Sequence, residues 1–355
     1  MNRKQQTSTP PPKAVALYSG GLDSTLAILT VQQQGIEVVA VTFLTHFGCD
    51  ISDRSSCSKN PFAAAEQFGF AVKLCHLSDA FIEIVKNPKY GHGKNMNPCM
   101  DCRILMLKEA RAFMEMIGAH FIITGEVLGQ RPMSQRRDAL HIIDRDSGLK
   151  GYVLRPLSAQ LLSPTIPEEQ GMVKRELLYR FSGRSRKPQM ALAEEFGLTD
   201  YPAPAGGCLL TEPNYAYRLR ELLAYDRNPS YDDLLLLRLG RHFRLSPDCK
   251  IIVGRNKAEN ELLLKLATKT DTCLRVEGFG SPLTLIKGEA NRDVIEIAAS
   301  LCARYSDAKK LPAAEVRILN SEESFKLEIT PADEETLCRY RIEKKREPQL
   351  VDTAG

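Results

Sequence analysis

The sequence predicts an α/β fold: a parallel, doubly wound sheet followed by a small carboxyl-terminal α+β domain. The first half alternates short apolar runs with helical patterns, which is typical of a parallel sheet with helices on both faces. Prolines then punctuate the chain from about residue 149 to residue 238. A second alternation of apolar and helical segments begins near residue 249 and indicates a separate domain.

Four apolar runs of the first half are expected to form strands. They cover residues 14–18, 36–44, 71–77 and 119–126. Helices are expected after the glycine pair at 20 and 21, over 61–69 and over 103–118, and the last two end at glycine, a common stop signal. Ligands of such sheets bind beyond the carboxyl ends of the strands, so the residues that follow these runs are the candidates for a site.

These patterns divide the chain into four expected parts. Residues 1–12 form a disordered lead-in, and residues 13–245 form a catalytic domain with a proline-rich extension. Residues 246–335 form the second domain, and residues 336–355 form a tail.

Composition excludes several classes of protein. With 43% hydrophobic and 26% charged residues the chain resembles ordinary globular proteins. No run approaches the roughly 20 apolar residues that span a bilayer, and the polar, proline-rich opening is not a secretory signal. We therefore expect no membrane partner. Ten cysteines without a signal favour a reducing cytoplasm. The net charge is only +4, but basic runs at 129–141 and 173–189 could follow a phosphate backbone or form solvated faces.

The stretch Ser-Gly-Gly-Leu-Asp-Ser, residues 19–24, predicts an anion-binding loop between a strand and a helix. Gly20 and Gly21 let the backbone approach an anion, and the amide groups at the helix start bind negative charge. Ser19 and Ser24 add hydroxyl donors. Because no lysine follows the glycines, γ-phosphoryl transfer is not expected, and the spacing does not fit Gly-x-Gly-x-x-Gly.

This loop resembles the signature of the PP-loop ATP pyrophosphatases, a family with a HUP-like sheet. The resemblance implies that ATP is split to AMP and pyrophosphate, and that a substrate oxygen is adenylated before a nucleophile displaces AMP. It implies that the loop and Mg²⁺ hold the leaving pyrophosphate, through Ser19, Gly20, Gly21, Asp23 and Ser24. It also implies an adenine pocket near Phe43 and Gly125.

Cys99 and Cys102 form a C-x-x-C pair at the expected start of a helix, with Asn97 as its cap. Residues three apart share one helical face, and the helix dipole is expected to favour their thiolates. Such a pair can be a redox couple, two of four zinc ligands, two ligands of an iron–sulfur cluster, or two structural cysteines. Cys208, after a proline- and glycine-rich stretch, is the expected third participant, and three cysteines suit a 4Fe–4S cluster with one open iron.

The constellation resembles the RNA-thiolating PP-loop enzymes, the thiouridine synthetase and thiouridylase group. The likeness runs from about residue 15 to residue 223 and includes TGEVLGQRPMSQ and PAPAGGCLLTEP. It implies that Cys99, Cys102 and Cys208 hold a 4Fe–4S cluster or carry a persulfide, and that the partners are tRNA or another RNA and a sulfur donor. Because the loop begins at residue 19, we expect neither the amino-terminal RNA-binding region nor the rhodanese domain of 4-thiouridine synthetases.

The stretch IIVGRNKAENELLLKLA resembles the start of the NFACT-R module, which is thought to bind RNA. Arg255, Lys257 and Arg275 are then candidates for phosphate contacts. The alternative is an appendage for homodimerisation.

The function that these observations favour is ATP-dependent thiolation of a tRNA uridine, catalysed by a tRNA sulfurtransferase that releases AMP and pyrophosphate. Sulfide on the open iron, or a cysteine persulfide, would be the nucleophile. The alternatives are an amide-forming PP-loop ligase, a desulfidase, and a non-enzymatic RNA-binding or redox-sensing relative.

Overall fold

The computed structural model describes residues 11–47, 61–202, 208–319 and 324–343. Within it the chain divides into two compact units, residues 1–209 and residues 210–355. Most of the expected lead-in and the end of the expected tail lie outside the described residues, as do residues 203–207 before Cys208.

The first unit is built on a five-stranded sheet in which every pairing is parallel. The strand order is β3-β2-β1-β4-β5. The strands are β1 (Lys13–Leu17), β2 (Glu37–Leu44), β3 (Ala71–His76), β4 (Phe121–Thr124) and β5 (Val153–Leu154). The predicted parallel sheet is thereby confirmed, and each of the four expected strands is present.

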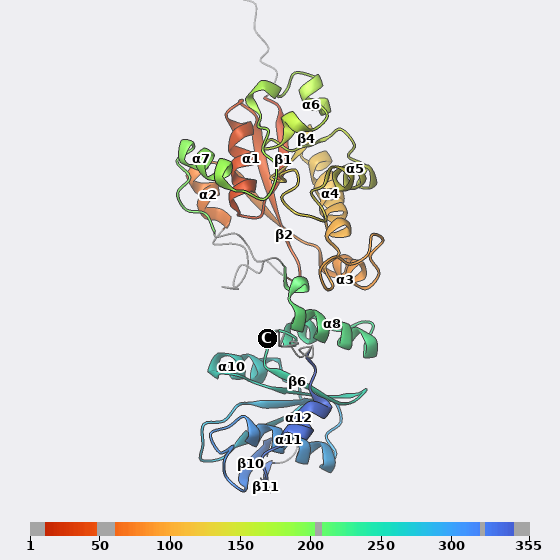
Figure 1. The fold of residues 1–355 in the computed structure, drawn as a ribbon, viewed down its shortest axis with the longest axis vertical. Helices are drawn as coiled ribbons and strands as arrows, with labels where there is room; N and C mark the ends of the chain where they lie inside the picture. Colours follow the sequence, from red (N-terminus) through yellow and green to blue (C-terminus); the bar gives the residue numbers. More distant parts are fainter. Residues whose placement is uncertain (1–10, 48–60, 203–207, 320–323, 344–355) are drawn as a thin grey trace, which may run out of the picture. The chain divides into compact units, whose positions relative to one another are not determined.

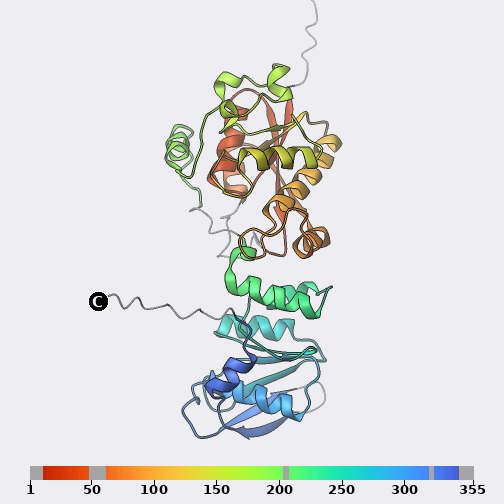
Figure 2. The ribbon, with the colours of Figure 1, turned by 45° about the vertical axis from the view of Figure 1, so that its right-hand side comes forward.

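Helices cover both faces of this sheet (Figure 1, Figure 2). On one face lie α1 (Leu22–Gln32), α2 (Pro61–Phe68) and α7 (Lys187–Glu195). On the other lie α3 (Ser78–Lys86), α4 (Cys99–Met116) and α5 (Arg137–Asp146). Alternate strand residues face the two layers, so that Ala14 and Ala16 of β1 pack with Ile28 of α1.

The strand order changes direction between β1 and β4, which places a crevice where their carboxyl ends meet. From β1 the chain builds outward through β2 and β3, and it then returns to add β4 on the other side. The glycine loop follows β1 and Gly125 follows β4, so both lie at this switch point.

Shorter elements and two further helices follow β5 along the chain. They are η1 (Ala159–Leu161), α6 (Ile166–Glu169), η2 (Arg175–Leu177), η3 (Leu209–Thr211), α8 (Pro213–Tyr225) and α9 (Tyr231–Leu236). Of these, η1, α6 and η2 belong to the first unit, and α8 and α9 belong to the second.

The second unit contains a six-stranded antiparallel sheet in the order β11-β10-β8-β9-β7-β6. Its strands are β6 (Arg241–Ser246), β7 (Cys249–Val253), β8 (Thr272–Val276), β9 (Thr284–Lys287), β10 (Ala314–Leu319) and β11 (Ser324–Ile329). Its other helices are α10 (Lys257–Leu266), α11 (Arg292–Arg304) and α12 (Glu334–Tyr340). Ile251 packs with α11 on one face and Ile252 with α10 on the other, which confirms the predicted α+β module.

Two boundaries differ from those expected. Helices α8 and α9, which the sequence placed in the catalytic domain, belong to the second unit, because Leu236 packs with Ile252 and Glu221 pairs with Arg244. Part of the expected tail is folded as well: α12 buries Leu337 in the second core, and the Ile342 N–H donates to the His242 carbonyl at 2.8 Å.

No helix of the described residues is long and apolar enough to cross a membrane.

Candidate functional site

The glycine loop joins β1 to α1 in an open, amide-rich turn. Gly20 has a φ of 71°, a left-handed conformation that favours glycine, and Gly21 is the N-cap of α1. The Ser24 hydroxyl donates to the Gly21 carbonyl at 2.9 Å and lies 3.2 Å from the Ser19 hydroxyl. The loop therefore presents the start of a helix and two linked hydroxyls, as an anion site requires.

Gly125, which follows β4, lies directly against the backbone of the glycine loop and the first turn of α1. A Cβ atom at this position would lie 2.5 Å from the Ser24 backbone nitrogen and 2.6 Å from the Asp23 carbonyl carbon. Only glycine allows β4 to end this close to the first turn of α1. The structure thus brings Gly125 to the loop, and its role in an adenine pocket stays a prediction.

Asp23 is held by side chains that come from distant parts of the chain. The Gln130 amide donates to its Oδ2 at 3.0 Å. Burial raises the pKa of the Asp23 carboxyl, while Gln130 and the nearby Arg186 and Arg131 guanidinium groups lower it. Asp23 Oδ1 is buried without a hydrogen-bond partner among the described residues, and so are both amide atoms of Gln189 beside it. An orphaned carboxylate oxygen beside an amide group whose own oxygen is also unpaired fits Mg²⁺, which prefers oxygen ligands.

The C-x-x-C pair lies in the first turn of α4, as predicted. Pro98, rather than Asn97, is the N-cap, and no side chain caps the helix. The helix dipole is expected to lower the pKa of the two thiols, but burial outweighs it. Burial raises the pKa of Cys99 and raises the pKa of Cys102 to about 12, although the Arg103 guanidinium opposes both shifts. Without a bound metal, both thiols are protonated at neutral pH.

Cys208 lies beside the pair. Its thiol is close enough to add to the rise in the pKa of Cys102, so the structure brings the three predicted cysteines to one place. Among the described residues, however, no three His, Cys, Asp or Glu side chains are arranged to hold a metal ion. Three thiols beside two arginines fit an iron–sulfur cluster by donor type and charge, but their side chains are not drawn together.

Arg131 connects the loop to the cysteines. Its guanidinium lowers the pKa of the Asp23 carboxyl and also that of the Cys99 thiol. Asp23, which would hold Mg²⁺ and pyrophosphate, and Cys99, which would carry sulfur, therefore both lie near one cation. A reaction that joins ATP cleavage to sulfur chemistry needs this proximity.

A buried ion network holds the segment that follows β4. Arg155 donates to Glu126 at 3.0 Å and to both carboxylate oxygens of Asp144, at 2.9 Å and 2.7 Å. Glu126 also lies 3.5 Å from the Nε atom of Arg103, the neighbour of Cys102. Arg155 and Glu126 are 4% and 3% exposed. The network thus links the strand that supports the loop to the helix that carries the cysteines.

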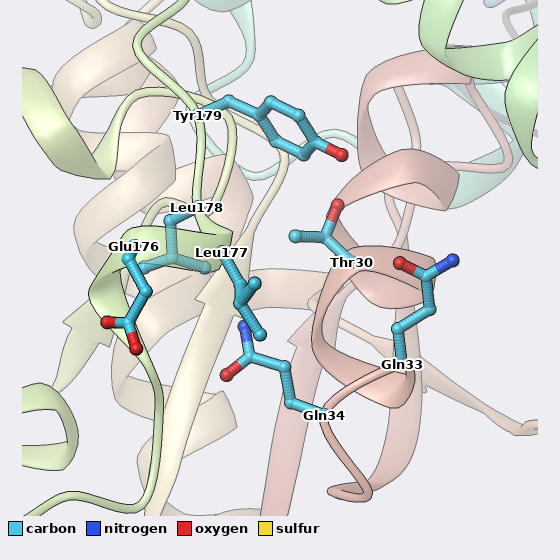
Figure 3. A pocket seen from close by; sticks show the side chains of 7 residues that line it. All are labelled: Thr30, Gln33, Gln34, Glu176, Leu177, Leu178 and Tyr179. Atoms are coloured by element: carbon cyan, nitrogen blue, oxygen red, sulfur yellow. The ribbon is translucent and has the colours of Figure 1, made fainter.

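Phe43 is less directly placed. It is buried near the end of β2, two residues beyond Val41, whose carbonyl accepts from Tyr18 N–H at 2.9 Å. The structure thus keeps Phe43 near the carboxyl end of the sheet, and its contact with adenine stays a prediction. A separate hollow of about 470 Å³ lies at the far end of α1, beside Thr30, Gln34 and Tyr179, and contains none of the predicted site residues (Figure 3).

The two basic runs of the sequence meet beside the loop. Leu128 and Ser182 form a parallel bridge, and the Gly183 N–H donates to the Leu128 carbonyl at 2.8 Å. Ser158 ties the two segments together, because its hydroxyl accepts from Leu128 N–H and donates to the Phe181 carbonyl. The exposed cations of the two runs are Arg131, Arg136, Arg137, Lys174, Arg180, Arg184 and Lys187.

Sequence reasoning missed the individual roles of Gln130, Arg131, Arg186 and Gln189. They lie more than a hundred residues from Asp23 in the chain, and only the basic character of their segments was visible.

Two family models match separate parts of the chain. Residues 11–160 match the family described as "Thiamine biosynthesis protein (ThiI)". Residues 240–341 match the "NFACT protein RNA binding domain".

The chain is also similar to parts of curated proteins and of a solved structure. The chain is 32% identical over 164 residues to a "Bifunctional protein NifU/MnmA" of Rubrobacter xylanophilus, covering 43% of this chain and 32% of that protein. It is 30% identical over 145 residues to a "Probable tRNA sulfurtransferase" of Thermococcus kodakarensis, covering 41% and 36%. The chain thus spans about a third of the length of these relatives. A 4-thiouridine synthetase–RNA complex with bound ATP shares 20% identity, with a TM-score of 0.31 and 54% of each chain covered.

Proposed function

We propose, for a chain that joins a ThiI-family PP-loop domain to an NFACT-R domain, ATP-dependent transfer of sulfur to RNA, with a tRNA uridine as the substrate. The observation that carries the proposal is that the Arg131 guanidinium lowers the pKa of both Asp23 and Cys99, so that the two sites share one nearby cation. It favours a single reaction over an ATP site and a cysteine site that work separately.

In this reaction the uridine carbonyl oxygen attacks the α-phosphate of ATP, and pyrophosphate leaves. Ser19, Ser24 and the amides at the start of α1 stabilise the departing charge, and Asp23 with Gln189 would hold Mg²⁺ beside it. A sulfur nucleophile then attacks the activated carbon, and AMP leaves. The loop activates the base, and the cysteines bring the sulfur.

Cys99, Cys102 and Cys208 are the residues that would hold a 4Fe–4S cluster, whose open iron would supply bound sulfide. In a persulfide reaction the same thiols would carry the sulfur themselves. The high pKa of Cys102 sets a cost for holding the cluster, because metal coordination must displace the thiol proton that burial retains. We place this chemistry in the reducing cytoplasm.

The test uses unmodified tRNA, ATP, Mg²⁺ and sulfide with anaerobically purified protein. We expect tRNA-dependent release of pyrophosphate and a thiolated nucleoside by mass spectrometry. Asp23→Asn should abolish both products. Cys102→Ser should abolish thiolation and lower the content of iron and acid-labile sulfide, whereas Cys338→Ser, at an exposed cysteine of α12, should change neither.

Three results would contradict the proposal. Full thiolation by Cys102→Ser would remove the cysteines from the reaction. ATP cleavage that depends on ammonia instead of tRNA and sulfide would indicate an amide-forming ligase. A chain whose cellular role survives Asp23→Asn would be a binding or sensing protein.

A further inference from the structure

We propose that four arginines of the second unit form a phosphate-binding surface for RNA, to which helix α8 contributes. These arginines are Arg218, Arg241, Arg255 and Arg341. The first precedes residues 240–341, which match the NFACT-R model. The inference deepens the proposed function by locating a contact with the RNA substrate, but its test measures binding alone.

The cluster is held together at the end of α9. The Arg218 guanidinium donates to the Leu237 carbonyl at 3.1 Å, and the Arg255 guanidinium donates to the neighbouring Arg238 carbonyl at 3.2 Å. Side chains from α8 and from the loop after β7 therefore meet at two successive carbonyls. The packing of α9 on the sheet brings together Arg218 and Arg255, which are 37 residues apart in the sequence.

Strand β6 and the segment after α12 add the other two arginines. Arg241 begins β6, and its guanidinium reaches the Gly254 carbonyl, next to Arg255, at 3.5 Å. Arg341 pairs with Phe243 of the same strand in an antiparallel bridge. The Arg241 guanidinium also stacks 4.3 Å above the Tyr305 ring, which holds its planar face in place.

The positive charge of this surface is only partly neutralised. Arg255 pairs with Glu259 and Arg341 pairs with Glu343. Within the described residues, Arg218 and Arg241 have no carboxylate at ion-pair distance, and the Arg218 Nε atom is buried without a hydrogen-bond partner. Burial lowers the pKa of both guanidinium groups, and the charge of nearby Arg255 lowers it further. An incoming anion relieves this repulsion.

Other charges of the second unit are matched more closely. On the sheet face of β10, Arg317 pairs with Glu277, and Lys326 pairs with Glu315. Arg275, a predicted phosphate contact, lies in register with Arg317 on this mixed surface. Of the three predicted contacts, Arg255 lies in the arginine cluster, where its guanidinium donates to the Arg238 carbonyl.

The chemistry of the cluster favours a phosphate backbone over an acidic protein. Guanidinium groups bind phosphate oxygens through paired N–H donors, and several of them at fixed positions match the repeated charges of a nucleic acid strand. A domain that matches an RNA-binding family carries most of the cluster.

The experiment measures binding of a labelled, unmodified tRNA transcript to the full chain by fluorescence anisotropy, across a series of salt concentrations. For Arg218→Gln and for Arg255→Gln we expect a loss of affinity of about fivefold to tenfold at low salt, and a salt slope smaller by about one. Arg292→Gln is the matched control, because Arg292 is an exposed arginine of α11 that pairs with Glu296 on its own helix. Its affinity should match that of the unmodified chain.

The double variant Arg218→Gln/Arg255→Gln decides the matter. If this variant bound tRNA with the affinity and salt slope of the unmodified chain, the proposal would be overturned. Binding of an acidic protein at the same surface would not rescue it. Arg255 is a largely exposed side chain, so its variant tests the surface even if Arg218→Gln fails to fold. The outcome is separate from the proposed reaction: Asp23→Asn can lose thiolation while it binds tRNA normally.

Discussion

In the first unit the buried Arg155 lies between two carboxylates, whereas in the second unit the buried Lys250 has the arginines Arg244 and Arg218 among its neighbours. Arg155 hydrogen-bonds Glu126 and Asp144, and all its charge is compensated locally. Lys250 is 7% exposed, and burial lowers its pKa to about 8. Glu221 partly offsets this shift, but both arginines add to it.

The difference shows what each unit does with charge. The first unit uses matched charges as a scaffold, which fixes β4 and α4 around a reaction site. In the second unit, basic and acidic residues are equal in number over residues 210–355, but Arg218 and Arg241 have no ion-paired carboxylate among the described residues, which favours an anionic ligand at that place. Its His242, 1% exposed, agrees with this contrast, because burial and the charges of Lys250 and Arg218 hold its pKa well below the usual range.

The largest effect is expected from breaking the matched network. Arg155→Met should destabilise the first unit by about 3–5 kcal/mol, because it leaves the half-buried Asp144 without its ion pair and the buried Glu126 with only the more distant Arg103. Chemical denaturation measures the loss. Arg136→Met is the control: Arg136 is 63% exposed and pairs with Asp138 at the surface, so its removal should cost less than about 1 kcal/mol. A small loss for Arg155→Met would mean that the network does not carry the fold.

A smaller effect is expected where the loop rests on β4. Gly125→Ala should destabilise the first unit by about 1–3 kcal/mol, because its new methyl group would collide with the backbone of Asp23 and Ser24. Calorimetric melting and ATP titration should show both a lower melting temperature and weaker binding.

Gly21→Ala is the matched comparison. A Cβ atom there would lie 3.4 Å from the Ser19 hydroxyl, an ordinary contact, and Gly21 has a φ of −89°. Its melting temperature should therefore stay close to that of the unmodified chain, while ATP binding weakens. Equal losses of stability in the two variants would show that Gly125 is not a support for the loop.

The sequence predicted those features that depend on neighbouring residues. The parallel sheet followed from alternating strands and helices, and the loop followed from six contiguous residues. The placement of Cys99 and Cys102 on one helical turn followed from their spacing. The prediction that the helix dipole favours their thiolates was wrong. Burial raises the pKa of Cys102 and outweighs the dipole, and this burial depends on tertiary packing.

Features that depend on distant contacts could not be predicted. Gln130 and Gln189 reach the Asp23 side chain only when the sheet has formed, because they are distant from it in the sequence. The boundary expected near residue 245 followed from a change of pattern, whereas the compact units follow from packing. Amphipathic helices such as α8 can pack against either neighbour, and the sequence pattern does not choose between them.

The smallest effect tests the unmatched side of the comparison, and its sign is opposite to that of Arg155→Met. Between pH 8 and about 10.4, unfolded Lys250 binds a proton that the folded side chain has lost, so this residue makes the free energy of unfolding rise with pH. Lys250→Met should remove that slope and stabilise the second unit at pH 7 by about 1–2 kcal/mol, because a buried charge is replaced by an apolar side chain. Calorimetry at pH 7 and pH 10 measures both changes, with Lys265→Met, at an exposed position of α10, as the control. A lower melting temperature for Lys250→Met at pH 7 would show that Glu221 compensates the charge as fully as the carboxylates around Arg155 do.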